Sequence, residues 1–198
     1  MERICAIFSH YRRISLTEMC LQKLAQQTVP PHRVVVADNG AGDGSLDGVK
    51  EQAAAGAYPF MLEIIDMPGN TGNAGGIARG LERAFSFPDV DAVWILDDDS
   101  WPEPDALACL LSHGPGTDGM EWPCVRVCKV VDLKQGGELS WPMVLLDEKD
   151  GRRIHVTRGD ALPEAPFLLT GGAFLGALVP REIHDKVRGP TAGLFIRC

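Results

Sequence analysis

The chain has 198 residues, of which 45% are hydrophobic, so it is long and apolar enough for one domain with a buried core. Its 27 Asp and Glu residues outnumber its 19 Lys and Arg residues, which gives a formal net charge of −8. This charge argues against non-specific nucleic-acid binding, and an anionic substrate would need help from a metal ion or a positioned Arg.

Strands and helices alternate along the first half of the sequence. Continuous apolar runs predict strands over residues 3–8, 34–37, 61–65 and 90–96. Helical spacing of apolar residues predicts helices over residues 16–24, from 45 or 47 to 55, over 73–85, and from 106 to 111. The first helix would start at a capping box formed by residues 15–18. This alternation predicts an α/β fold, an open and mostly parallel sheet with helices on both faces.

The second half of the sequence is less regular. We expect strands over residues 125–133 and 153–157, joined by connections rich in Pro, Gly and charge. A last strand over residues 175–179 and a short helix from Pro180 to Val187 follow. The sequence contains no internal repeat and no low-complexity tract.

Three consecutive aspartates, Asp97, Asp98 and Asp99, close the fourth predicted strand. Adjoining carboxylates at the mouth of an apolar strand repel one another, so the arrangement favours a bound cation. Side chains alternate along a strand, so Asp97 and Asp99 would project to one side and Asp98 to the other. Oxygen ligands of this kind suit Mg²⁺ or Mn²⁺ together with a substrate diphosphate. The alternative is a solvated acidic turn, because residues 100–103 resemble a helix start.

Asp38 ends the second predicted strand. Ligands of open α/β sheets bind beyond the carboxyl ends of the strands, where a nucleotide would lie. Asp38 could accept a hydrogen bond from the ring N–H of uracil or thymine, or from a ribose hydroxyl. It could equally form a local turn with Asn39 and Gly40, a common arrangement for Asp.

Residues 69–80 are rich in Gly around the start of a predicted helix. Glycines let the backbone approach a ligand, and a helix N-terminus attracts anions. Arg79 would lie early in this helix, able to face a diphosphate; a flexible turn with a surface Arg is an equally good interpretation. A dinucleotide-binding fingerprint is excluded by position, because no Gly occurs in residues 9–13 after the first strand. A P-loop is excluded because no Gly-Lys-Ser/Thr occurs.

Targeting and redox signals are weak. The start of the sequence lacks signal-peptide architecture, and its most apolar later stretch, residues 167–180, is too short and too rich in Gly to span a bilayer. The six cysteines include no CxxC pair, and most are expected to be small buried hydrophobes. A disulfide or metal role for Cys124 and Cys128, the one close pair, is the less favoured interpretation. We expect a reduced, cytoplasmic location, either free or peripheral at the inner face of the membrane.

The ordered motifs together resemble glycosyltransferases of family 2 with a GT-A fold, and within them the galactofuranosyl- and rhamnosyltransferases. The motifs that carry this resemblance are residues 34–40 with 43–45, residues 69–80, and residues 94–100. They lie within about the first 110 residues. Residues 167–189 also look like the acceptor-side segment of the family.

The resemblance implies an inverting, metal-dependent glycosyltransferase. It would move a sugar from a UDP- or dTDP-sugar to a growing cell-surface glycan, free or lipid-linked, with Mn²⁺ or Mg²⁺ as cofactor. Residues 1–113 would bind the donor and residues 114–198 the acceptor within one domain; we expect residues 124–166 to influence acceptor choice.

The resemblance also assigns roles to individual residues. Asp97 and Asp99 match the metal-binding positions of the family. The residues implied in donor binding are Asp38, Asn70, Gly76, Arg79, Asp97, Asp98, Gly171 and Gly172.

Inverting transfer also needs a carboxylate base that deprotonates the acceptor hydroxyl. In the family that this sequence resembles, the carboxylate base follows a segment like residues 189–196. This sequence ends at Cys198. Glu182, His184 and Asp185 lie nearby, on a helix expected at the surface. We favour a fragment of a longer enzyme over a catalytically incomplete domain that binds a nucleotide-sugar or a partner. A nucleotidyltransferase would need a Gly-rich loop directly after the first strand, which is absent.

Overall fold

The computed structural model describes residues 2–40, 42–112, 123–146, 150–162, 169–171 and 174–187. The large sheet consists of β1 (Ile4–His10), β2 (Arg33–Asp38), β3 (Met61–Asp66), β4 (Ala92–Ile95), β5 (Arg126–Val127) and β10 (Ala177–Pro180). The small sheet consists of β6 (Val131–Asp132), β7 (Glu138–Leu146), β8 (Arg153–Arg158) and β9 (Leu169–Gly171). The helices are α1 (Ile14–Ala25), α2 (Asp47–Ala54), α3 (Gly72–Ser86), α4 (Ala106–Ser112), α5 (Arg181–Val187) and two 3₁₀ turns, η1 (Leu133–Gln135) and η2 (Gly159–Ala161).

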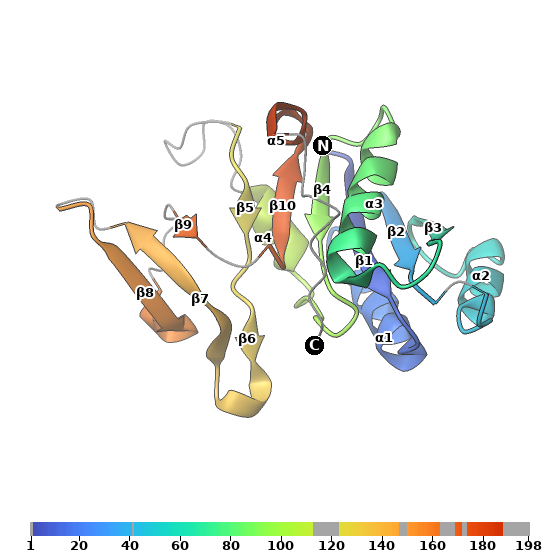
Figure 1. Ribbon diagram of the computed structural model, residues 1–198, viewed down its shortest axis with the longest axis horizontal. Helices are drawn as coiled ribbons and strands as arrows, with labels where there is room; N and C mark the ends of the chain where they lie inside the picture. Colours follow the sequence, from blue (N-terminus) through green and yellow to red (C-terminus); the bar gives the residue numbers. More distant parts are fainter. Residues whose placement is uncertain are drawn as a thin grey trace.

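The large sheet is open and mostly parallel, as predicted. Its strand order is β3-β2-β1-β4-β10-β5, and β3, β2, β1 and β4 run parallel to one another. β10 enters antiparallel between β4 and β5. In the small sheet, β7 lies between β6 and β8 and also pairs with β9. Figure 1 shows the small sheet beyond the β5 edge of the large one.

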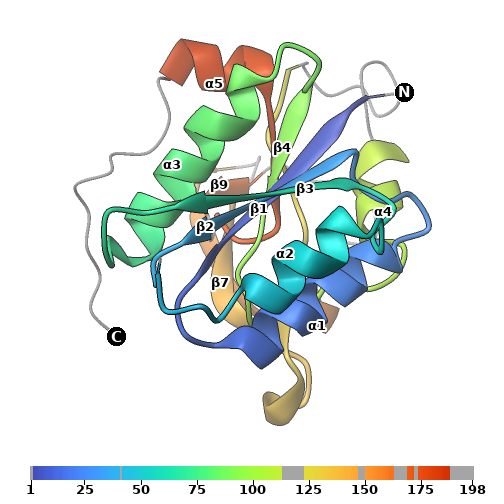
Figure 2. The same ribbon diagram turned by 90° about the vertical axis from the view of Figure 1, so that its right-hand side faces the viewer.

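Helices cover both faces of the large sheet. Figure 2 shows α1, α2 and α4 on one face and α3 and α5 on the other. All seven residues of β1 are buried. Ile4, Ala6 and Phe8 join the core beneath α1, α2 and α4, whereas Cys5 and Ile7 join the core beneath α3. Burial on both faces is why the central strands read as continuous apolar runs.

The small sheet has a much smaller core of its own. Its buried apolar side chains in the described part of the chain are Leu139, Met143 and Val156. The two clusters of the large sheet together contain many times more buried side chains.

The predicted capping box of the first helix is wrong. The helix begins at Ile14, with Arg13 as its N-cap, and no side chain caps it. The hydroxyl of Thr17, inside the expected box, instead bonds the ring Nδ1 of His10 at 2.8 Å.

The predicted single strand over residues 125–133 is also wrong. The chain forms β5 in the large sheet and β6 in the small one, because it passes from one sheet to the other at residues 128–130. The following segment, expected as an irregular connection, contains β7. β9 was not predicted, and the last strand starts at Ala177 because residues 174–176 turn, with Gly176 at φ 78°.

No helix of the described residues combines the length and apolarity needed to cross a membrane.

Candidate functional site

The carboxyl ends of β1, β2 and β4 lie side by side. They form the carboxyl edge of the large sheet, which is distinct from its edge strands β3 and β5. The strand register sets His10 opposite Asp38, and Ile7 opposite Ile95. Buried polar side chains gather at this edge: Ser9, His10, Thr17, Asp38, Asn39 and Asp98. Burying polar groups is costly unless they are hydrogen-bonded, so their concentration marks a candidate site.

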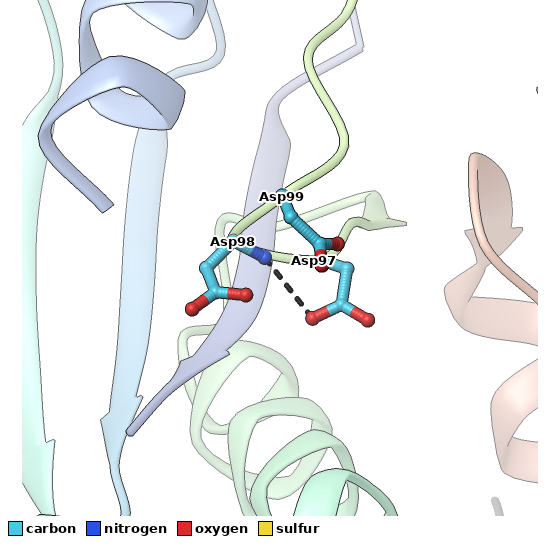
Figure 3. Close-up of side chains that lie close together, drawn as sticks. All are labelled: Asp97, Asp98 and Asp99. Atoms are coloured by element: carbon cyan, nitrogen blue, oxygen red, sulfur yellow. Dashed lines mark hydrogen bonds between the residues drawn. The ribbon is translucent and has the colours of Figure 1, made fainter. Parts of the chain in front are cut away.

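The acidic triplet, Asp97–Asp99, follows β4 in a turn, in which Ser100 N–H donates to the carbonyl of Asp97 at 3.2 Å. Figure 3 shows the carboxylates of Asp97 and Asp99 on one side of the chain and that of Asp98 on the other. This is the predicted orientation, although the residues lie in a turn and not in the strand itself. One oxygen atom from each of the three carboxylates lies within 4.8 Å of the others.

The electrostatics of the triplet favour a positive ligand. Burial raises the pKa of Asp98 to about 6; the guanidinium of Arg13 opposes this rise, and the carboxylates of Asp97 and Asp99 add to it. Burial, with the charge of Asp99, also raises the pKa of Asp97. Asp98 is only 1% exposed, and its Oδ2 is buried with no hydrogen-bond partner in the described part of the chain. The clustered carboxylate oxygens fit a divalent cation such as Mg²⁺ or Mn²⁺, and the unpartnered Oδ2 of Asp98 is a further acceptor for a ligand.

Arg13 is a site residue that the sequence did not reveal. Its guanidinium donates to Oδ2 of Asp99 at 2.9 Å and to Oδ1 of Asp98. Burial lowers the pKa of Arg13, but the three carboxylates together outweigh this effect and hold it above its ordinary value. Arg13 is therefore a cation over the triplet. The sequence showed only that two basic residues, Arg12 and Arg13, follow the first strand.

Asn73 connects the triplet to α3. Its amide Nδ2 donates to Oδ2 of Asp97 at 3.1 Å, and its Oδ1 accepts a hydrogen bond from Ser9 Oγ at 2.8 Å. The first turn of α3 is thus bonded to β1 and to the turn after β4. This network orients the Asp97 carboxylate.

Asn39 binds the same helix start from β2. Its Oδ1 accepts hydrogen bonds from the backbone N–H and the hydroxyl of Thr71, at 3.1 and 2.9 Å, and its Nδ2 donates to Gly72 O at 3.3 Å. A Cβ atom on Gly76 would lie 2.7 Å from Ser9 Cβ and 3.1 Å from Asn39 Nδ2. The missing side chain at Gly76 is therefore explained by close packing of α3 on β1; its role in donor binding stays a prediction.

Asp38 is buried at the end of β2. Its Oδ1 accepts a hydrogen bond from Gly40 N–H at 2.8 Å, so the local Asp turn offered by the sequence does form. Its Oδ2 makes no hydrogen bond to the described residues, and this oxygen is the one that could accept a ligand N–H.

His10 is fully buried beside Asp38. Its Nδ1 and Nε2 contact the hydroxyls of Thr17 and Ser45 at 2.8 and 3.0 Å. The sequence pattern did not reveal this residue, because its partners come from α1 and from the loop after β2. His10 fixes that loop against the strand end.

We expect the protein to lose stability below about pH 6.5 partly through His10. Burial lowers the pKa of His10 from its ordinary value of 6.5, against the charges of Asp38 and Asp43. Protons therefore bind His10 more tightly in the unfolded state than in the folded state. The contribution of His10 to the free energy of unfolding is complete above pH 6.5 and is lost as the pH falls through the pKa of His10 in the folded state. The slope is at most about 1.4 kcal/mol per pH unit. Urea denaturation between pH 7.5 and 5 should show a steeper loss for the wild type than for His10→Gln; equal slopes would contradict the prediction.

The other predicted site residues lie as follows. Asn70 is exposed, and its Oδ1 accepts from Gly72 N–H at 2.9 Å. Arg79 lies near the middle of α3, not early in it as expected, and pairs with Glu82 at 3.1 Å on the exposed face. Gly171 ends β9 in the small sheet, and Gly172 lies outside the described residues. The roles of these four residues in donor binding stay predictions.

The candidate bases of α5 lie away from the triplet. β10 is antiparallel to β4 and sets Pro180 opposite Ala92, the first residue of β4. Because α5 follows Pro180 directly, it begins near the amino end of β4, whereas Asp97–Asp99 follow the carboxyl end of that strand. Glu182 and Asp185 lie on this surface helix, which has no buried residue, as expected from the sequence.

The sequence model of Glycosyl transferase family 2 matches residues 5–138. Galactofuranosyltransferase GlfT1 from two strains of Mycobacterium tuberculosis is 33% identical over 205 residues, which cover 99% of this chain and 61% of GlfT1. The chain thus spans about 61% of the length of these curated relatives.

Among solved structures, the mannosyltransferase PcManGT from Pyrobaculum calidifontis, in complex with GDP-Man and Mn²⁺, is 26% identical. The match has a TM-score of 0.51 and covers 66% of this chain and 36% of that protein.

Proposed function

The chain belongs to glycosyl transferase family 2, and on this premise we propose that it takes part in metal-dependent, inverting transfer of a sugar from a UDP- or dTDP-sugar to a growing glycan. The observation that carries the proposal is the acidic triplet at the sheet edge, with the buried and unpartnered Oδ2 of Asp98. Support also comes from PcManGT, which was solved with a nucleotide-sugar and Mn²⁺. A cytoplasmic site of action, free or at the inner face of the membrane, is part of the proposal.

The donor nucleotide would lie over the ends of β1, β2 and β4. Asp38 Oδ2 would accept the ring N–H of uracil or thymine, while Oδ1 stays bound to Gly40 N–H. His10 would stabilise this contact through its hydrogen bond to Ser45, which fixes the loop after β2. PcManGT was solved with a guanosine nucleotide, so the preferred base is itself an outcome of the test. A galactofuranosyl donor is favoured by the likeness to GlfT1.

Asp97 and Asp99 would hold the metal from one side of the turn, and Asn73 would fix the Asp97 carboxylate. A divalent cation bound there would neutralise charge on the departing nucleoside diphosphate. Asp98, on the other side, would contact the donor ribose or sugar. The first turn of α3, fixed by Asn39, would present its backbone N–H groups to the donor.

Deprotonation of the acceptor hydroxyl is assigned to a carboxylate outside the described residues. α5 lies at the wrong edge of the sheet for Glu182 or Asp185 to act on a donor at the triplet. This placement also favours the second candidate function, a domain that binds a nucleotide-sugar or a partner without efficient transfer. If the protein encoded by a longer reading frame transfers the sugar and this chain does not, the chain is part of a longer enzyme. If neither protein transfers the sugar, the binding domain is favoured.

A thermal-shift panel tests the proposal directly. The protein would be melted with UDP-, dTDP- and GDP-sugars, each with Mn²⁺ and with EDTA. We expect a UDP- or dTDP-sugar to raise the melting temperature by several degrees with Mn²⁺ and by far less with EDTA, because a ligand that binds only the folded state stabilises it. No shift with any nucleotide-sugar would contradict donor binding, and equal shifts with Mn²⁺ and EDTA would contradict the metal role.

A further inference from the structure

Arg13 closes over the acidic triplet from the loop between β1 and α1. It contacts two different carboxylates, those of Asp98 and Asp99, through two guanidinium nitrogens. The Arg13 side chain is 50% exposed, while the Asp98 side chain is 1% exposed. The guanidinium therefore lies between solvent and a buried carboxylate.

The backbone next to Arg13 has an uncommon conformation. Arg12 has φ 59°, in the left-handed region, and it is the non-Gly residue with positive φ in the described part of the chain. Such conformations cost free energy and persist when the surrounding contacts hold them. The ion pairs of Arg13 are contacts of this kind, immediately after the turn.

The oxygens that Arg13 occupies overlap with those that a metal ion would need. Arg13 holds Oδ2 of Asp99, one of the two proposed metal-binding residues. A guanidinium and a divalent cation within a few ångströms also repel each other, and in a partly buried site this repulsion is only incompletely screened. The two cations therefore cannot share the triplet without cost.

We propose that Arg13 acts as an internal substitute cation, which neutralises the triplet in the metal-free protein and has to leave it when a divalent metal ion binds. The inference rests on the proposed metal role of the triplet. Arg13 is thus a residue that sets metal affinity: it lowers the affinity for the metal alone and keeps three adjoining carboxylates compatible with the fold before the metal arrives.

A permanent structural ion pair is the competing interpretation. In that case Arg13 would stay on Asp98 in the metal-bound protein, and removing it would loosen the turn and weaken metal binding. The two interpretations predict opposite signs for the same substitution.

Calorimetric titration with Mn²⁺ alone, at pH 7.5 and without nucleotide, measures whether replacing Arg13 raises or lowers the affinity for Mn²⁺. Arg13→Gln is expected to bind Mn²⁺ about tenfold more tightly than the wild type, because a repelling charge and a competing ion pair are both lost. Arg13→Lys, which keeps the charge, should stay close to the wild type. Arg12→Gln is the matched control: its guanidinium lies over the Tyr11 ring, 5.1 Å from the centroid, and it should leave Mn²⁺ affinity unchanged.

Equal or weaker Mn²⁺ binding by Arg13→Gln, with a wild type that binds Mn²⁺, would overturn this inference and leave the proposed function standing. No Mn²⁺ binding by either protein would overturn this inference together with the metal role in the proposed function. A second measurement uses the wild type alone. Titration with Mg²⁺ should shift the NMR signal of the Arg13 Nε–H as the side chain is released, and a signal unchanged at saturation would overturn the inference.

Discussion

Replacing Asp99 with Asn is expected to abolish the strengthening of nucleotide binding by Mn²⁺. Asp99 is the exposed member of the triplet, and its carboxylate lies on the same side of the turn as that of Asp97. An amide cannot supply the charge that a divalent cation requires, and a metal contributes several kcal/mol to binding of a diphosphate. The ratio of UDP or dTDP affinity with Mn²⁺ to that with EDTA should fall by about a hundredfold in calorimetry.

Asp66→Asn is the matched control for this measurement. Asp66 ends β3 at the same edge of the sheet, pairs in register with Asp38 and is exposed. Its loss should leave the Mn²⁺ dependence unchanged. If the wild type binds the nucleotide equally well with Mn²⁺ and with EDTA, the triplet is a solvated acidic turn and the metal role is wrong.

Gly76→Ala is expected to destabilise the protein by about 2 kcal/mol, although alanine is the better helix former. The new Cβ would lie 2.7 Å from Ser9 Cβ, an atom fixed to the buried strand β1, so helix and strand have to separate. That movement would also disturb Asn39, whose Nδ2 would be 3.1 Å away. Urea denaturation should show a lower free energy of unfolding, and nucleotide binding should weaken as well.

Gly80→Ala, one turn further along α3, provides the opposite case. Its Cβ would meet Ile7 side-chain atoms at 3.4 Å, an ordinary packing distance. The helix-propensity gain, up to about 1 kcal/mol, should then leave this variant as stable as the wild type or more so. A Gly76→Ala protein as stable as Gly80→Ala would show that α3 does not pack on Ser9 in this way.

The first half of the fold was predictable from the sequence because β1, β2 and β4 are buried on both faces and the helices carry regular apolar spacing. The second half was not, for two physical reasons. β7 alternates apolar residues at Leu139, Trp141 and Met143, but Pro142 within it argues against a strand. The division into β5 and β6 depends on which sheet each segment joins, and no local pattern records that choice.

The candidate site was predictable only where its residues end a strand or closely follow one. Asp38 ends β2 and the acidic triplet follows β4, and the sequence alone singled them out. Arg13, Asn73 and His10 escaped notice because their partners are distant in sequence: Arg13 and Asp99, for example, are 86 residues apart. A polar residue in a turn has many possible partners, and only the folded chain selects one.

The small core of the small sheet has a consequence for how this chain can diverge. Leu139, Met143 and Val156 anchor that sheet, while separate and much larger clusters hold the edge that carries the triplet. We therefore expect substitutions at exposed positions of β7 and β8 to leave the packing of β1, β2 and β4 unchanged. The surface of the small sheet can then vary while the strand ends that carry the triplet stay the same.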